Sequence, residues 1–170
     1  TMMKLHSDNE ECNFSFIEAK QKLETYCAYQ ERCQFEVEQK MRSWNLSNEQ
    51  KQQLIVHLIS NRFIDEERFA EAFVSGKFRI KKWGRIKIKS QLKQKKISEY
   101  SINKALLGID GDEYWTALLQ LAELKWFTVL QKREQDTWKC KAKVLRFLAS
   151  KGYEQDLIYD ALKELNISID

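Results

Sequence analysis

The segment Gly84–Ser98 reads GRIKIKSQLKQKKIS and contains the pattern that decides the fold. Ile88 and Leu92 are four residues apart, so both lie on one face of a predicted helix. Ile97 follows just past that helix, and Ser98 is a residue type that caps helix starts. The segment therefore predicts one helix that ends near residue 95 and a second that begins near residue 99.

The same spacing of apolar residues occurs in two other parts of the chain. They are Val37, Met41 and Leu46, and further along Val144, Leu148 and Tyr153. A period near 50 residues is typical of a helical repeat array, in which each unit packs against its neighbour. We therefore expect three units of three helices, at residues 14–60, 61–108 and 109–168. The expected helices lie near 14–30, 33–43, 48–60, 66–79, 84–95, 99–107, 113–131, 136–150 and 154–165.

The residue before the third apolar position of each unit is Asn45, Lys96 or Gly152. This position follows a helix, where a left-handed backbone is common. We expect that conformation at all three residues, although lysine adopts it less readily than glycine or asparagine.

Polar residues mark the starts of other helices. Ser47 and Gln50 have the spacing of a capping box. The acidic run Asp65–Glu67 places negative charge where the N-terminal dipole of a helix favours it. Capping is therefore a better account of these carboxylates than acid–base catalysis, and we expect Arg68 to form a local pair and His57 to be structural.

Composition favours an all-α protein. The 170 residues include no proline and five glycines, which is fewer turn residues than a sheet protein of this size usually needs. The abundant Gln, Lys, Glu, Leu and Ala favour helix. No apolar run approaches the roughly 20 residues that span a bilayer, and no signal peptide is visible. We expect a cytoplasmic protein without membrane association.

The sequence shows no constellation for catalysis or metal binding. Four cysteines occur without a CxxC pair, and two histidines are the available nitrogen ligands, so a zinc site is not expected. Nucleophile–base pairs and Gly-rich phosphate loops are also missing. We therefore expect no enzyme activity, no cofactor and no metal, and we expect reduced thiols.

Positive charge is concentrated in Lys77–Lys96, which holds ten Lys or Arg residues and no acidic residue, whereas the whole chain carries +4. Such a surface attracts polyanions, because phosphates attract cations and binding releases counterions. Trp83 either stacks on a base or closes a small helical core, and we favour the core. The predicted binding residues are Lys77, Arg79, Lys81, Lys82, Trp83, Arg85, Lys87, Lys89, Lys93 and Lys96.

Three segments together resemble the RecX family. They are FIDEERFAEAF at residues 63–73, GRI at 84–86 and QLKQKKI at 91–97. The middle unit matches the family pattern closely, and the outer units match in repeat layout. Two residues depart from it, because Lys96 replaces an expected glycine and Arg85 stands where proline is common.

The resemblance implies three tandem three-helix repeats that form an elongated, curved molecule. It also implies binding along the groove of the RecA–single-stranded DNA filament, with inhibition of RecA ATPase, strand exchange and co-protease activity. DNA repair and the SOS response would be its setting. The expected partners are RecA and single-stranded DNA, with duplex DNA as a further candidate, and we expect a monomer.

Two other functions fit the basic stretch. One is a general DNA-binding helical protein of helix-turn-helix type, which would place a recognition helix in the major groove. The other is a scaffold for acidic proteins, because a cationic surface also suits an acidic protein partner.

Overall fold

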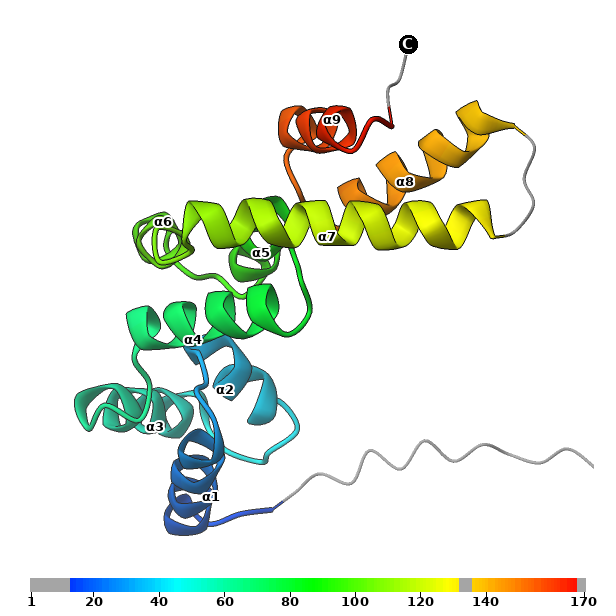
Figure 1. The fold of residues 1–170 in the computed structure, drawn as a ribbon. Helices are drawn as coiled ribbons and strands as arrows, with labels where there is room; N and C mark the ends of the chain where they lie inside the picture. The colour runs from blue at the N-terminus through cyan, green and yellow to red at the C-terminus, as the bar shows by residue number, and fades with distance from the viewer. Residues whose placement is uncertain (1–12, 132–135, 168–170) are drawn as a thin grey trace, which may run out of the picture. The chain divides into compact units, whose positions relative to one another are not determined.

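The computed structural model describes residues 13–131 and 136–167, and every regular element within them is an α-helix (Figure 1). Each expected helix is present, with ends that agree to within three residues, so the all-α prediction is confirmed. The helices are α1 Phe16–Tyr29, α2 Gln34–Lys40, α3 Asn48–Ser60, α4 Glu66–Arg79, α5 Arg85–Gln94, α6 Glu99–Leu106, α7 Gly111–Leu130, α8 Thr137–Lys151 and α9 Gln155–Glu164.

The chain separates into two compact units, residues 1–69 and 70–170, and the boundary passes through α4. The division into three repeats at 14–60, 61–108 and 109–168 stays a prediction, and its last residue lies outside the described residues.

The first unit has a core formed by α1, α2 and α3. The predicted pair Val37 and Met41 is buried in it, and Trp44 packs edge-on against Phe14 with ring centroids 5.0 Å apart. The capping box of α3 is confirmed, since Ser47 and Gln50 exchange side-chain to backbone hydrogen bonds. The buried core residues are Ala19, Leu23, Cys27, Val37, Met41, Trp44, Leu54, Leu58 and Ile64.

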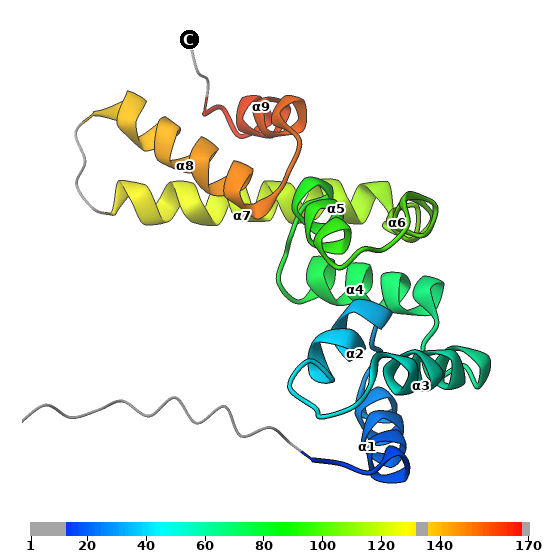
Figure 2. The ribbon, with the colours of Figure 1, turned by 180° about the vertical axis from the view of Figure 1, so that it is seen from behind.

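In the second unit α8 runs back alongside α7, and α9 packs against both, as Figure 1 and the reverse view in Figure 2 show. The predicted apolar pairs on α5 and α8 are fully buried, so each helix presents one apolar face to the core. These pairs are Ile88 with Leu92 and Val144 with Leu148.

The left-handed turns are found at two of the three expected residues. Lys96 has a φ of 60° and Gly152 a φ of 95°. The prediction for Asn45 was wrong, because its φ is not positive. The chain leaves α2 through a longer series of turns that carries Trp44 into the core, and the Asn45 side chain donates a hydrogen bond to Asn13 at 2.8 Å.

Candidate nucleic-acid interface

The end of α4 and the connection to α5 carry three exposed cations, Arg79, Lys81 and Lys82. Lys82 has a φ of 56°, and its carbonyl oxygen accepts a hydrogen bond from the Tyr153 hydroxyl at 3.1 Å. Burial raises the pKa of Tyr153 to about 12, so this hydroxyl keeps its proton at neutral pH and remains a donor. Tyr153 thus holds the connection in a backbone conformation that few lysines adopt.

The start of α5 lies directly against the end of α8. The Gly84 amide donates to the Lys151 carbonyl at 2.8 Å, and the Ile86 amide donates to the Gly152 carbonyl at 3.0 Å. A Cβ on Gly84 would collide with the Gly152 carbonyl, and a Cβ on Gly152 would collide with Lys87. Since Ile86 N–H is a group that a helix start leaves unpaired, these carbonyls satisfy α5 in place of an external anion.

Arg85 belongs to a network that joins α5 to α7 and α9. Its backbone amide donates to the Tyr114 hydroxyl oxygen at 3.1 Å, and that hydroxyl donates to Glu154 at 2.6 Å. The guanidinium lies 3.9 Å from the Tyr114 ring centroid and 3.4 Å from the Glu154 carboxylate. Burial, reinforced by the bond to Glu154, raises the pKa of Tyr114 far above its ordinary value, so the hydroxyl stays a donor.

Lys89 and Lys93 share one carboxylate partner. Their ammonium nitrogens lie 3.0 Å and 3.7 Å from Oε1 of Glu99, the first residue of α6. The hydrogen bond from Lys89 and the charge of Lys93 hold the pKa of Glu99 below its ordinary value. The sequence stretch Lys77–Lys96 has no acidic residue, but the fold supplies one from the next helix.

Trp83 is half-buried and organises two lysines. The Lys77 and Lys87 ammonium groups lie 4.9 Å and 4.6 Å from the centroid of its ring. Lys87 also donates to the Ser150 carbonyl at the end of α8, at 3.2 Å. The indole therefore already carries cations over its ring, which a stacking base would have to displace.

The predicted cations thus differ in their surroundings. Arg85, Lys87 and Lys89 are partly buried and bond to groups on other helices. Exposed side chains belong to Arg79, Lys81, Lys82, Lys93 and Lys96.

Sequence reasoning missed a second group of cations on α8. This helix holds five Lys or Arg residues and no acidic residue. The positive charge of α8 does not show in the net charge of residues 109–168, because the rest of that segment carries many acidic residues. Counting charge helix by helix would have revealed it. The cations are Lys139, Lys141, Lys143, Arg146 and Lys151.

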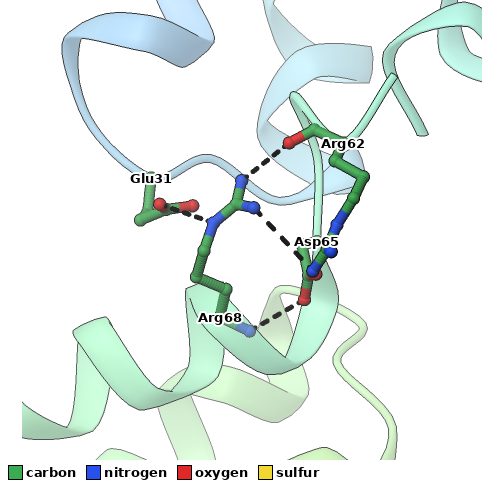
Figure 3. Close-up of polar contacts among 4 residues, drawn as sticks. All are labelled: Glu31, Arg62, Asp65 and Arg68. Carbon is green, nitrogen blue, oxygen red and sulfur yellow. Dashed lines mark hydrogen bonds and ion pairs between the residues drawn. The ribbon is translucent and has the colours of Figure 1, made fainter. Parts of the chain in front are cut away.

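The acidic start of α4 has a structural role (Figure 3). Asp65 accepts a hydrogen bond from the Arg68 amide at 3.0 Å, and this bond, with a second from the Arg62 side chain, lowers the pKa of Asp65. The Arg68 guanidinium donates to Glu31 at 2.7 Å and to the Arg62 carbonyl at 2.9 Å. The predicted cap is confirmed. Arg68 has the predicted local partner in Asp65, at 4.0 Å, but its shorter ion pair is with Glu31, 37 residues away.

Other polar groups also have structural partners. His57 lies 2.7 Å from the Glu24 carboxylate, as expected for a structural histidine. Among the described residues, no three His, Cys, Asp or Glu side chains gather in a group that could hold a metal ion. No helix in the described part of the chain is both long and apolar enough to cross a bilayer.

These features define an all-α protein of tandem short helices with a cationic surface. Family models of RecX match two segments, the second three-helix domain at residues 65–106 and the third at 112–162. Regulatory protein RecX of Clostridium tetani is 38% identical over 130 residues, covering 76% of this chain and 59% of that protein. A RecX of Clostridium botulinum is 40% identical over 102 residues, covering 60% of this chain and 47% of that protein.

The chain belongs to the RecX family of regulatory proteins. It spans 59% and 47% of the length of these two relatives. A crystal structure of RecX from Lactobacillus salivarius has the same fold, with a TM-score of 0.73 at 24% identity over 90% of this chain and 97% of that one.

Proposed function

We propose that this protein is a non-catalytic regulator of homologous recombination. In this proposal it binds the RecA–single-stranded DNA filament and inhibits the ATPase, strand-exchange and co-protease activities of RecA. Membership of the RecX family supports a regulatory role, and the name of the family points to RecA as the partner. A monomeric, cytoplasmic protein with an elongated, curved shape stays a prediction.

The observation that carries the proposal is the exposed cationic connection between α4 and α5. Arg79, Lys81 and Lys82 are exposed, and the Lys82 carbonyl accepts a hydrogen bond from the Tyr153 hydroxyl. The Lys81 carbonyl accepts one from the Lys151 ammonium group. A backbone that is already held has less conformational entropy to lose when its side chains bind phosphates. This connection is therefore suited to contact the DNA backbone, while Arg85 and Lys89 position α5 through Glu154 and Glu99.

A helix-turn-helix reader is supported less well. Such a reader places the N-terminal residues of a recognition helix against base edges. At the start of α5, Gly84 and Arg85 instead contact residues 151–154 and Tyr114.

The test is the ATPase rate of RecA on single-stranded DNA with and without this protein, at two salt concentrations. We expect inhibition at the lower salt that weakens at the higher salt, because screening and counterion competition reduce phosphate contacts. An unchanged ATPase rate at saturating protein and low salt would contradict the proposal. Inhibition that does not depend on salt would place the contact on RecA and not on DNA.

A further inference from the structure

A stripe of cations runs along one side of α8. Lys139, Lys143 and Arg146 lie on one side of the helix, and Lys151, twelve positions after Lys139, lies about 120° further round at its end. Lys139 also pairs with Asp136 at 3.6 Å. Phe147 lies on the same side, and the buried residues Cys140, Val144 and Leu148 lie beside it. We name Lys139, Lys143, Arg146 and Lys151 the α8 stripe.

The α8 stripe meets the exposed connection between α4 and α5. Lys151 donates from its ammonium group to the Lys81 carbonyl at 3.3 Å. In the other direction, Lys87 donates to the Ser150 carbonyl at 3.2 Å. The cations of the two regions therefore belong to one continuous surface, although about 60 to 70 residues of sequence separate the bonded pairs.

An aromatic ring orders the lysines at each end of this junction. Lys125 of α7 and Lys151 of α8 lie 4.8 Å and 5.7 Å from the Phe147 ring centroid. Trp83 holds Lys77 and Lys87 in the same way, at 4.9 Å and 4.6 Å. Contacts with a ring face restrict the ammonium group but leave its N–H donors free to bind an anion.

We propose that the α8 stripe, with Lys125, is a second phosphate-binding site, which takes the backbone of single-stranded nucleic acid and extends the surface of Arg79, Lys81 and Lys82. The inference rests on the proposed function for the choice of nucleic acid as the ligand. α8 is about 22 Å long, at 1.5 Å per residue, so its cations can follow several successive phosphates. Lysine ammonium groups bind phosphates as point charges, and the Arg146 guanidinium is a residue type that binds phosphate with two parallel hydrogen bonds.

The end of α8 also has a structural need for cations, because the last carbonyls of a helix carry partial negative charge. Lys87 and Lys151 lie at that end, so substituting them would change both the stability of the protein and its binding. Arg146 and Lys125 separate the two effects. Arg146 is exposed and donates to Ala142 of its own helix at 3.3 Å, and Lys125 lies on α7.

The test compares the double variant Arg146→Glu plus Lys125→Glu with the control Arg42→Glu plus Lys163→Glu. The control residues are exposed cations on other elements, and both proteins have the same net charge. Binding of a fluorescent oligothymidylate to the full chain is measured by anisotropy over a range of salt concentrations. We expect the double variant to bind at least about tenfold more weakly, with a salt slope reduced by about 1.4, since each single-strand contact contributes about 0.7.

The control should lose less than about threefold in affinity, because reversed charges away from the site act only through screened, long-range repulsion. Circular dichroism melting checks that both variants fold. Equal losses in the two variants, or no binding of the oligonucleotide by the parent protein, would overturn the inference.

Measuring RecA filament binding with the same proteins separates this inference from the proposed function. If the parent binds the filament while the double variant and the control bind the oligonucleotide equally, the α8 stripe fails and the proposed function stands. If the parent does not bind the filament, and the double variant but not the control binds the oligonucleotide more weakly, the inference about the α8 stripe is supported and the proposed function is wrong. If the parent does not bind the oligonucleotide, and the double variant but not the control no longer binds the filament, the stripe contacts protein and the inference is wrong.

Discussion

The two cation-rich helices α5 and α8 resemble each other in sequence and differ in what surrounds their charges. Neither contains an acidic residue. On α5, Glu154 and Glu99 from elsewhere in the second unit reach the cations at the start and middle of the helix. On α8, Lys139 pairs with Asp136 just before the helix at 3.6 Å, Arg146 bonds to its own helix, and Lys151 lies over Phe147. A count of lysines therefore locates positive charge but does not show which cations remain open to a ligand.

The largest expected effect comes from breaking the junction between the two helices. Gly84→Ala places a Cβ against the Gly152 carbonyl, where the neighbour is backbone and cannot move aside. We expect the free energy of unfolding to fall by about 3 kcal/mol, as in severe overpacking. Urea denaturation followed by circular dichroism measures it.

Gly76→Ala is the matched control for that substitution. Gly76 lies inside α4, and a Cβ there would meet no atom within 4 Å. Alanine should stabilise the helix by about 0.5–1 kcal/mol, because it restricts the unfolded chain more than glycine does. If both variants have the stability of the parent, the close backbone contact of Gly84 with Gly152 is incorrect.

A second pair of variants sharpens the contrast between anchored and exposed cations. Arg85→Ala removes the guanidinium from Tyr114 and Glu154, and we expect a loss of about 1–2 kcal/mol for a half-exposed network. Arg79→Ala should change stability by less than about 0.5 kcal/mol, because Arg79 is exposed.

Oligonucleotide binding should reverse the order of these two variants. Arg79→Ala should reduce the salt slope by about 0.7, the contribution of one single-strand phosphate contact. Arg85→Ala should leave the slope unchanged under conditions where it is folded. A larger slope change for Arg85→Ala than for Arg79→Ala would show that the anchored cation binds the ligand.

The third prediction concerns the carboxylate that reaches the middle of α5. Glu99→Gln removes the carboxylate that Lys89 and Lys93 share, so both ammonium groups become available to phosphates. We expect oligonucleotide affinity to rise by about threefold at low salt, since the lost pairs are exposed and individually weak. Anisotropy titrations of parent and variant measure this difference.

The difference in oligonucleotide affinity between the parent and Glu99→Gln has a defined pH dependence. The lysines lower the folded-state pKa of Glu99, so its pairing stabilises the protein above the ordinary glutamate pKa of about 4.3 and is lost as pH falls through the lowered value. The affinity difference between parent and variant should therefore stay constant from pH 7 to pH 5. A difference that disappears within this range would mean that Glu99 is not paired with the lysines.

A small effect on stability is expected at Lys82, whose φ is 56°. Lys82→Gly should be as stable as the parent or more stable by up to about 1 kcal/mol, because glycine adopts this conformation without strain. Its salt slope should fall by about 0.7 through the lost cation. Lys82→Ala should show the same slope but lower stability than Lys82→Gly, and equal stabilities would argue against the left-handed turn.

The sequence by itself determined the helices, because the information that specifies them is local. Apolar residues four positions apart fixed the buried faces, as Ile88 with Leu92 shows, and Ser47 and Asp65 marked helix starts through bonds to residues three positions later. The left-handed turn at Gly152 was predictable for the same reason. Asn45 shows the limit, because the buried Trp44 decides the path of the chain there.

Only the tertiary structure decided which cations are anchored and which are exposed. The partners of Arg85 and Lys87 lie 69 and 63 residues away, and no local pattern encodes such pairs. Glu99 is close in sequence, but it reaches Lys89 because α6 folds back on α5. The proposed link between the α8 stripe and the connection before α5 likewise came from the structure. Ion pairs and backbone contacts depend on distances in space that helix packing sets.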